Sequence, residues 1–538
     1  MKPGGVLVIG LDGGTLRVLR PLADAGIMPA FARLLASGRA GTLRSTLPWY
    51  TIPGWVSLMT GVSPASHGLL YWVAAGRDEY FEDRRPGRRF VTSADIPVPT
   101  FWDVAGAAGR RVAVLNMPLT YPAWPVNGEM ITGLLTPQAA ETGTCHPADL
   151  LSRFPGYRVD LSTSREAASP DAGAAEGIDR AAYVSELIEL THGRARVGGE
   201  LLRADVDLGV VVFVGPDRVS HRAWPEQEAV VAGGAPSGEI ERLVVAYYRA
   251  LDESISALLD AAGPGVNVVV VADHGFGPPP PSKVAVNAWL LERGFLQLKD
   301  PAAARVSARR ALRRVLRPIA RISRRRRVAR ADPDLVDWPR SSAYAVGFPH
   351  TRMFGVIVNR AGVKREGRVP EGDVPALLAR LRDELATVAT EDGRPIVRHV
   401  YAREELGATA PGFPDLLVET HDPFIPSQRL LGGVRSQPFD LRSGVHEPDG
   451  VLVLAGPAVR GTDAAEADIV DVGPTVLGLL GIAAPPWMEG KVRDELVVLP
   501  PLAAPPEGVP GPAGAAPAVT HDQEREIEEH LRTLGYEE

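Results

Sequence analysis

Short runs of consecutive apolar residues recur along the chain, and each run ends in a polar or glycine-rich turn. The runs lie at residues 5–14, 111–118, 207–217, 266–275, 414–420 and 449–457. Apolar side chains at successive positions place hydrophobic groups on both faces of an extended segment, as in strands that are covered on both sides. The pattern therefore predicts a set of buried β-strands.

Segments between these runs carry apolar residues at helical spacing. The clearest of them span residues 28–38, 100–109, 239–263 and 374–390. Strands that alternate with helices favour a mainly parallel sheet with helices on both faces. We therefore predict an α/β fold, a three-layer αβα sandwich around a mainly parallel central sheet.

The domain organisation is interpreted from breaks in this pattern. The predicted α/β unit occupies residues 1–498 and carries insertions near residues 73–98, 138–180 and 278–345. Residues 499–519 are rich in Pro, Ala and Gly, a composition typical of a linker. Residues 520–538 are predicted to form a short acidic helix at the C-terminus.

A strongly basic segment lies inside the third predicted insertion. Residues 305–330 contain twelve arginines, with apolar residues at helical spacing and a proline, Pro318, that should kink or break a helix. Three interpretations stay open: a solvated insertion, a lid whose arginines reach an anionic substrate, or a basic segment that lies on an anionic membrane.

Composition narrows the classes of partner. The chain has 538 residues, a formal net charge of -7 and a single cysteine, Cys145. The net charge argues against a nucleic-acid-binding protein, and one cysteine excludes an internal disulfide framework. The sequence shows neither a membrane-spanning segment nor a signal-peptide pattern, so a cytoplasmic location is expected.

Candidate chemistry falls where the predicted strands end. Carboxylate and imidazole side chains follow or flank these strands at Asp12, Asp217, His221, Asp273, His274 and His446. In open parallel sheets, ligands bind beyond the carboxyl ends of the strands. Oxygen and imidazole ligands suit Zn, Mn and related ions, and six ligands are too many for one tetrahedral ion. The set therefore predicts two divalent ions, most simply Zn, with Mn as the alternative.

Thr51 lies in the stretch "LPWYTIPGWVSLMTG", just before a predicted helix. Pro53 suits the first turn of that helix, which places Thr51 at the cap. Helix N-termini bind anions, and a threonine hydroxyl becomes a useful nucleophile when a base or metal activates it. Thr51 is therefore either a cap residue or the nucleophile of a phosphoryl-transfer site.

These motifs together resemble the alkaline phosphatase superfamily. The resemblance is to its type I phosphodiesterase/nucleotide pyrophosphatase-like branch and, most closely, to its predicted phosphohydrolase/phosphomutase branch. It is carried by "VLVIGLDGGT", "STLPWYTIPGWVSLMTGVSPASHG", "FVGPDRVSHRAW", "VVVADHGFG", "GVHEPDGVLVLAGPAV" and "DIVDVGPTVLGLLGIAAPPWMEGKV". It covers most of residues 5–497 and implies an alkaline-phosphatase-like catalytic domain.

The resemblance also implies roles for individual residues. One metal ion would be held by Asp12, Thr51, Asp273 and His274, and the other by Asp217, His221 and His446. Thr51 would be the nucleophile that is transiently phosphorylated. Gly54 and Trp55 stand where the nucleotide pyrophosphatase pattern has Asn-His, and Thr-x-Pro-x-Trp is more like the phosphohydrolase/phosphomutase branch.

Five further residues are candidates for contact with the substrate. Trp55 offers a ring for stacking, although a core role is equally compatible with its position. Asn116 and Tyr121 follow a predicted strand and would line the pocket. His350 and Arg352 in "FPHTRMFG" would meet a phosphate or carboxylate.

Three functions are compatible with this reading. The first is a two-metal phosphohydrolase that cleaves a phosphate mono- or diester of a small molecule through a phosphothreonine. The second is a phosphomutase or phosphotransferase that uses the same site with an alcohol acceptor. The third is a non-catalytic binding protein, which predicts the loss of Thr51 or of a ligand, and the sequence retains them all.

Overall fold

The computed structural model describes residues 1–73, 89–138, 140, 142–161, 179–299, 335–428, 430, 437–438, 443–461, 463–512 and 520–534. The basic segment at 305–330 lies outside these residues, as do parts of all three predicted insertions.

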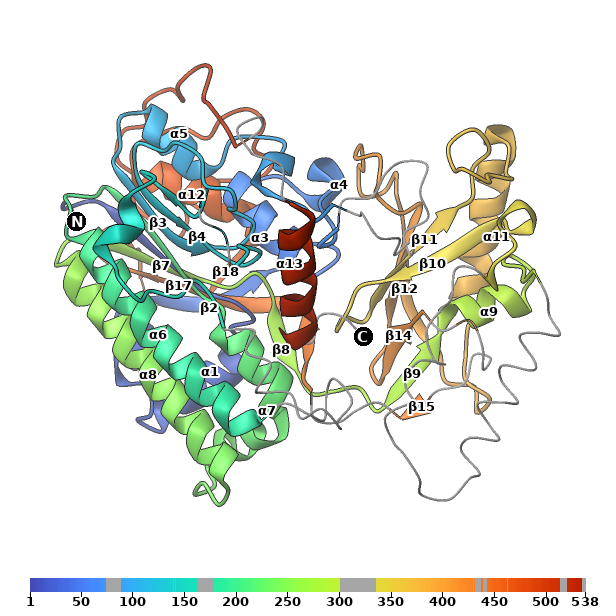
Figure 1. The fold of residues 1–538 in the computed structure, drawn as a ribbon, viewed down its shortest axis with the longest axis horizontal. Coiled ribbons are helices and arrows are strands. Elements are labelled where there is room, and N and C mark those ends of the chain that lie inside the picture. The colour runs from blue at the N-terminus through green and yellow to red at the C-terminus, as the bar shows by residue number, and fades with distance from the viewer. Residues whose placement is uncertain are drawn as a thin grey trace.

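A nine-stranded sheet forms the centre of the larger of two bodies (Figure 1). Its strands, in spatial order, are β18 (Ala465–Asp468), β2 (Arg39–Arg44), β17 (Asp449–Ala455), β7 (Asn267–Val271), β1 (Val6–Leu11), β6 (Leu208–Phe213), β3 (Val112–Met117), β4 (Gly128–Thr132) and β5 (Cys145–His146). Neighbouring strands from β7 through β4 run parallel, and only β17 and β5 pair antiparallel with their neighbours. The central strands β1, β6 and β7 are buried along their whole length.

Helices cover both faces of this sheet (Figure 1). One layer contains α1 (Leu16–Asp24), α2 (Pro29–Ser37), α6 (Arg180–Leu202), α7 (Gly215–Val231) and α8 (Glu239–Ala262), which pack against one another. The other contains α3 (Thr51–Thr60), α5 (Phe101–Ala107) and α12 (Val472–Leu479), followed by short α4 (Pro64–His67) beside α3. The predicted three-layer α/β fold with a mainly parallel sheet is therefore confirmed.

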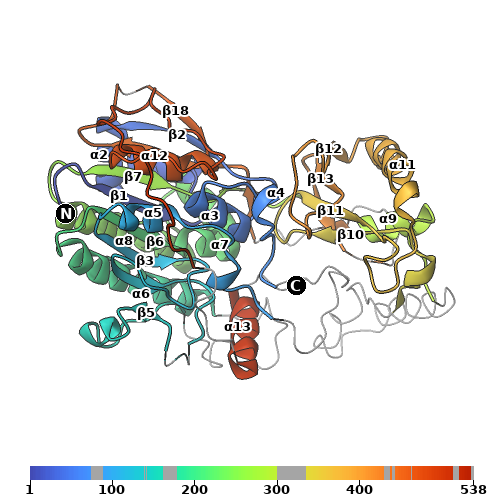
Figure 2. The same cartoon turned by 90° about the horizontal axis from the view of Figure 1, so that it is seen from above.

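A smaller body lies beside the first (Figures 1 and 2). It has a four-stranded antiparallel sheet in the order β10 (Ala343–Gly347), β11 (Met353–Val358), β13 (Leu416–Thr420) and β12 (Val397–Ala402). Helices α9 (Val286–Glu292) and α11 (Val374–Ala386) pack on this sheet. A second small sheet joins β14 (Phe424–Ser427), β9 (Ser282–Ala285) and β15 (Gln437–Pro438).

The segment 414–420 contains a strand, as predicted, but this strand lies outside the central sheet. It forms β13, which pairs antiparallel with β11 and β12 in the smaller body. All five of its residues are buried, so its apolar run correctly indicates burial. Burial on both faces does not specify pairing partners, because strands in either sheet bury the same residue types. The last strand of this antiparallel sheet along the chain ends at Thr420.

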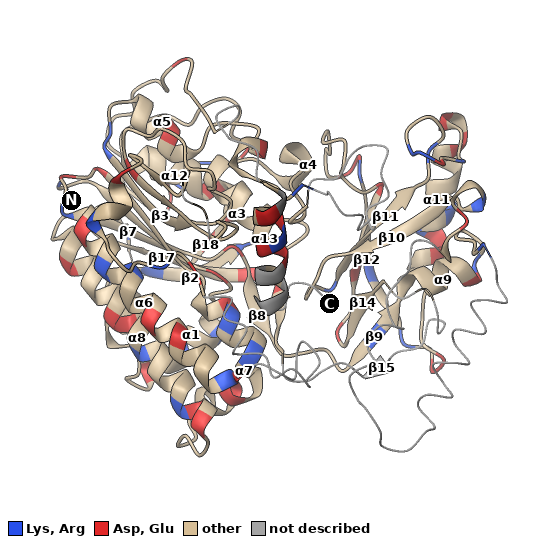
Figure 3. Cartoon of the chain, in the orientation of Figure 1, with Lys and Arg blue, Asp and Glu red and all other residues tan. Residues whose placement is uncertain are grey.

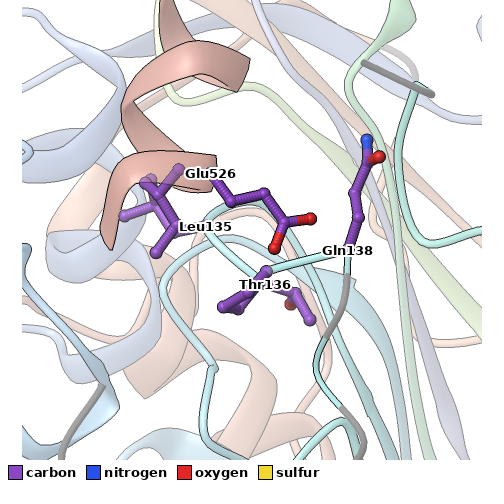
Figure 4. A pocket seen from close by; sticks show the side chains of 6 residues that line it. Leu135, Thr136, Gln138 and Glu526 are labelled. Atoms are coloured by element: carbon purple, nitrogen blue, oxygen red, sulfur yellow. The ribbon is translucent and has the colours of Figure 1, made fainter. Parts of the chain in front are cut away.

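Helix α13 (His521–Leu534) returns to the larger body after the proline-rich stretch (Figure 2). Ile527 and Leu531 are buried in the main hydrophobic core. Figure 4 shows Glu526 facing the loop after β4, with Leu135, Thr136 and Gln138 around a small pocket.

Charges of both signs are interspersed on the outer helices of the larger body (Figure 3). No helix in the described part of the chain is long and apolar enough to cross a membrane.

Candidate metal centre and nucleophile

The candidate site lies at the carboxyl ends of the three central strands. Asp12 directly follows β1, and Asp273 and His274 come just after β7. Asp217 comes shortly after β6, which pairs with β1 on the side opposite β7. Because parallel strands end at the same edge of a sheet, the topology brings these four side chains together.

Asp217 and His221 lie on a helix. The strand ends at Phe213, and α7 begins at Gly215, so Asp217 lies in its first turn and His221 one turn later. The apolar run at 207–217 therefore covers both the strand and the first turn of the helix. Asp217 lies in that turn and not at the end of the strand. Residues four apart lie on the same side of a helix, which is why both side chains point to the site.

His446 reaches the site through a short pair of strands. Strand β16 (Val445–Glu447) pairs antiparallel with β8 (Gly275–Gly277), and His446 is opposite Phe276. Since β8 directly follows His274, this pairing places the His446 ring against the His274 ring, with centroids 3.8 Å apart.

Asp217, His221 and His446 form one set of possible metal ligands. Asp217 Oδ1 lies 3.4 Å from Nε2 of His221 and 3.4 Å from Nε2 of His446. The two Nε2 atoms are 3.0 Å apart. All three residues are buried. One oxygen and two imidazole nitrogens that converge in this way suit a divalent transition-metal ion.

Asp12 and His274 form a second set, which also includes Asp217. His274 Nε2 is 3.8 Å from Asp12 Oδ1, 4.0 Å from Asp217 Oδ1 and 3.3 Å from Asp273 Oδ2. Thr51 Oγ1 is 3.3 Å from the same nitrogen. Asp217 thus lies between the two sets, whereas the resemblance assigns it to the His221 and His446 set alone.

The hydrogen bonds of two histidines show that this site fits metal ions. His274 Nδ1 faces the Gly275 carbonyl at 3.1 Å, which can only accept, so the Nε2 of neutral His274 presents a lone pair to the carboxylates. His221 Nδ1 faces Ser443 Oγ at 3.2 Å, and that hydroxyl donates to Gly444, so His221 Nε2 also presents a lone pair. Lone pairs that face carboxylate oxygens repel unless a cation lies between them.

Unpaired carboxylate atoms support the same conclusion. Among the described residues, Asp12 Oδ1 and Asp273 Oδ2 are buried and accept no hydrogen bond. Asp273 Oδ1 does accept one, from Gly13 N at 3.1 Å. Buried carboxylate oxygens without partners are costly, and divalent cations are the groups that offset this cost in proteins.

The electrostatics of the acidic groups follow from burial and crowding. Burial raises the pKa of Asp12 well above its ordinary value, and the charges of Asp273 and Asp217 raise it further. Burial likewise raises the pKa of Asp273 to about 6. Bound cations would favour the ionised forms of Asp12, Asp273 and Asp217.

Thr51 is the first residue of α3, and Tyr50 occupies the N-cap position. The prediction of Thr51 as the cap residue was therefore off by one position. The first N–H groups of a helix have no intrahelical acceptor, so Thr51 sits where an anion is favoured. Its side chain is fully buried beside His274.

Gly54 allows helix α3 to lie close to Asp273. A Cβ atom at position 54 would lie 2.9 Å from the Asp273 Cβ and 3.0 Å from its carbonyl oxygen. Real Cβ atoms do not approach that closely, so an asparagine at this position would push α3 away from Asp273. The glycine is therefore part of the close packing of this site.

Trp55 and Asn116 both point into the protein. Trp55 is fully buried, and its Nε1 donates to Asp12 Oδ2 at 3.4 Å, so the indole supports a candidate metal ligand. Asn116 donates from Nδ2 to the Val159 carbonyl at 2.9 Å and accepts from the Tyr157 hydroxyl. In this structure neither side chain faces an open pocket.

Tyr121 lies under the C-terminal helix. Burial raises the pKa of its hydroxyl, which pairs with Gln523 of α13 and lies near Glu526. Its predicted contact with a substrate stays a prediction, because α13 occupies this side of the ring.

His350 and Arg352 come from the turn between β10 and β11 of the smaller body. The His350 ring lies against His221, with centroids 4.3 Å apart. Arg352 pairs through both terminal nitrogens with Glu447, at 2.7 Å for Nη2 to Oε2, and its Nη1 lies 2.9 Å from Asp422. The structure therefore brings His350 to the site and engages Arg352 with carboxylates of the protein.

Two charged residues beside the site were not predicted from the sequence. Arg218 is buried and pairs through both terminal nitrogens with Asp160. Glu447 directly follows His446 and holds Arg352. Each of Arg218 and Glu447 is adjacent in sequence to a candidate ligand, and this adjacency was the one local signal for them.

A comparison with protein families identifies the family of this chain. The family model for type I phosphodiesterase / nucleotide pyrophosphatase matches residues 6–425. No curated protein sequence matches the chain significantly.

Solved structures share the fold. Phosphonoacetate hydrolase from Sinorhizobium meliloti, in complex with phosphonoacetate, superposes with a TM-score of 0.52 and 18% identity, over 88% of this chain and 94% of that one. Murine ectonucleotide pyrophosphatase/phosphodiesterase 5, in complex with AMP, has a TM-score of 0.48 and 13% identity, over 92% and 99% of the two chains. At these identities the first likeness shows a common fold.

Proposed function

The chain belongs to the type I phosphodiesterase and nucleotide pyrophosphatase family of the alkaline phosphatase superfamily, and from this premise we propose how it acts. Members of the family are phosphoester hydrolases that use divalent metal ions, and this chain is a phosphoester hydrolase. We propose that it cleaves a phosphate mono- or diester of a small molecule at a two-metal site, with Thr51 as the nucleophile.

The observation that carries the proposal is the position of the Thr51 hydroxyl. It lies at the start of α3, 3.3 Å from His274 Nε2, which belongs to one of the two candidate metal sets. A phosphate at the helix N-terminus would present its phosphorus to Thr51 Oγ1. Two serines of the described chain also contact these ligands, but away from the atoms that face one another: Ser45 donates to the Asp273 backbone carbonyl at 2.5 Å, and Ser443 lies against His221 Nδ1.

The chemistry divides into two displacements at phosphorus. In the first, the Thr51 Oγ1–P bond forms and the ester P–O bond breaks; Thr51 gives up its hydroxyl proton and the departing oxygen takes up one proton, so that the alcohol leaves. In the second, water attacks the phosphothreonine, the P–Oγ1 bond breaks, and Thr51 regains a proton as phosphate or a phosphomonoester leaves. Two divalent ions bound by these side chains would offset the charge of the phosphate and lower the pKa of hydroxyl groups beside them.

We assign the ions to the two sets of side chains described above, with Zn as the first candidate and Mn as the second. Asp12, Asp273 and His274 would hold the ion beside Thr51, and His221 and His446 the other. Asp217 would contribute to the second ion and contact the first set. The lone pairs of His274 and His221 support this assignment.

The test is an activity assay with Thr51→Ala. The purified protein is assayed with 4-nitrophenyl phosphate, bis-(4-nitrophenyl) phosphate and a phenylphosphonate ester, and bound metal is measured by mass spectrometry. We expect Thr51→Ala to retain metal but to lose at least about 10³-fold in kcat/KM, because the covalent step has no nucleophile. Rapid quenching of the wild type should give a phosphorylated peptide that contains Thr51. Thr387→Ala, on the exposed surface of the smaller body, is the matched control.

Two outcomes would change the proposal. Full activity of Thr51→Ala, or a protein that binds no divalent metal, would overturn it. If an added alcohol takes up the phosphoryl group in preference to water, the protein is a phosphotransferase or phosphomutase that uses the same site and nucleophile.

A further inference from the structure

The turn of the smaller body between β10 and β11 enters the candidate metal centre. His350 lies in this turn, and its ring centroid is 4.3 Å from that of His221 and 6.0 Å from that of His446. The backbone of His350 has φ of 57°, in the left-handed region that non-glycine residues rarely adopt. Unusual backbone conformations of this kind concentrate at functional sites, where the surrounding structure holds them.

The surrounding structure holds this turn firmly. The backbone N–H of His446 donates to the His350 carbonyl at 2.8 Å. Two residues later, Arg352 pairs through both terminal nitrogens with Glu447, the neighbour of His446. The turn and strand β16 are therefore joined at His350 itself and two residues after it, which holds the backbone that carries the imidazole beside the ligands.

The in-line geometry of phosphoryl transfer indicates which oxygen of the substrate lies near His350. In phosphoryl transfer the attacking and leaving oxygens are roughly in line, on opposite sides of phosphorus. The attacking oxygen is Thr51 Oγ1, which lies 3.3 Å from Nε2 of His274, a member of the set that contains Asp12. The leaving oxygen therefore faces the other set, Asp217, His221 and His446, and His350 lies against that set.

Exposure distinguishes His350 from the ligands that it contacts. His221 and His446 are buried, at 6% and 0% exposure, whereas His350 is only partly buried. His350 is therefore the most accessible of these three histidines. An imidazole N–H in this position is a preorganised donor for charge that develops on the departing oxygen.

We propose that His350 is a catalytic residue that donates a hydrogen bond to the leaving oxygen of the substrate. This inference rests on the proposed function and extends it to the class of substrate. Such a donor matters most when the leaving group is a poor one, such as an unactivated phenol or an aliphatic alcohol, because more negative charge then develops on the oxygen. The natural substrate is accordingly an ester of an unactivated alcohol.

The experiment compares esters that differ in the leaving group. The full-length protein and His350→Asn are assayed with a series of aryl esters from 4-nitrophenyl to phenyl, built on the ester type that the wild type hydrolyses. Asparagine tolerates a positive φ and replaces the imidazole by a shorter side chain, whose amide can still donate but not from the position of the ring. His350→Gly also tolerates this backbone and has no side-chain donor, so it is the decisive variant and is assayed in the same series. His399→Asn, an exposed histidine of β12 in the same body, is the matched control.

We expect the loss in kcat/KM to grow along the series. It should be less than about tenfold for the 4-nitrophenyl ester and about 10²-fold for the phenyl ester, the effect of removing one preorganised donor. Bound metal should stay unchanged, and His399→Asn should behave as the wild type throughout.

The inference would be overturned if kcat/KM fell by the same factor for every ester, or if it fell only in proportion to the metal that the variant fails to bind. Either result would mean that His350 only supports the ligands. Thr51→Ala in the same series separates the two proposals. If that variant stays active, the proposed function itself fails. If it is inactive while His350→Gly shows no dependence on the leaving group, only the role of His350 fails.

Discussion

At the scale of single residues, this protein depends on which nitrogen of each buried histidine carries a proton. His274 and His221 each donate from Nδ1 and turn Nε2 toward the carboxylates, which suits a metal ligand. His67 shows the opposite arrangement, because its Nδ1 accepts the Leu69 N–H at 3.0 Å and its Nε2 faces Ser57 Oγ at 3.0 Å. His67 is therefore a neutral structural histidine, whose Nδ1 cannot be protonated without breaking a hydrogen bond.

His67 should make the protein sensitive to acid. Burial lowers its pKa to about 3, so below pH 6.5 the unfolded chain binds a proton that the folded chain resists. Stability should fall as the pH decreases from about 6.5, at up to about 1.4 kcal/mol per pH unit. Urea unfolding between pH 7 and 5 should give a flatter stability curve for His67→Gln than for the wild type.

The control for this prediction is His192→Gln, an exposed histidine on α6. That variant should keep the slope of the wild type. Parallel curves for the wild type and His67→Gln would show that other groups cause any acid sensitivity.

At the scale of elements, one salt bridge links the smaller body to the metal centre. Arg352 is 6% exposed and holds Glu447 at the end of β16, one residue from His446. A guanidinium with two parallel hydrogen bonds fixes the orientation as well as the distance of its partner. The pairing of β16 with β8 and this salt bridge together position His446.

Loss of this salt bridge should weaken metal binding. We expect Arg352→Lys and Glu447→Gln each to lower metal affinity about 10- to 100-fold, the range for residues that orient ligands, because lysine cannot pair at two points. The double variant should lose little more than either single variant, since both remove one interaction. Competition with a chelator measures the affinities.

Arg394→Lys serves as the control, because Arg394 forms an exposed pair with Asp392. It should leave metal affinity unchanged. If the Arg352 and Glu447 variants bind metal as the wild type does, the salt bridge has no role in positioning His446.

At the scale of the whole molecule, three buried carboxylates lie inside the larger body, at the carboxyl ends of its central strands. Asp12, Asp217 and Asp273 are all at 0% exposure, where charge is strongly disfavoured unless it is compensated. The fold therefore needs cations at this position for full stability near neutral pH. Ligands that bind only the folded state stabilise it by mass action.

Removal of metal should make stability depend on pH in a defined direction. Burial raises the pKa of Asp273 to about 6, so the metal-free folded state binds a proton more tightly than the unfolded chain does. Its contribution is fully present below pH ~4 and is lost as the pH rises through about 6. The difference in Tm between metal-loaded and chelator-treated protein should therefore widen from pH 4.5 to 7.

Asp273→Asn tests the cause. Without metal, this variant should be more stable than the wild type at pH 7, because one uncompensated charge is absent. It should also bind metal more weakly. A gap in Tm that does not change with pH would contradict the prediction.

The sequence by itself determined the burial of the strands and the kinds of side chain at their ends. The runs at 5–14, 207–217 and 266–275 became the adjacent strands β1, β6 and β7, because apolar periodicity is a local property that survives in any fold that buries it. Parallel strands then place the residues that follow them at one edge. For this reason the sequence was sufficient to predict that the candidate ligands lie together.

The tertiary structure alone decided which residues meet. Asp217 lies between both sets of ligands, Trp55 turns inward to Asp12, and Arg352 binds Glu447, which is 95 residues away in the chain. The segment 414–420 joined a second sheet for the same reason. Each of these outcomes depends on pairing between distant segments, and the pattern of residues within one segment carries no information about its partner.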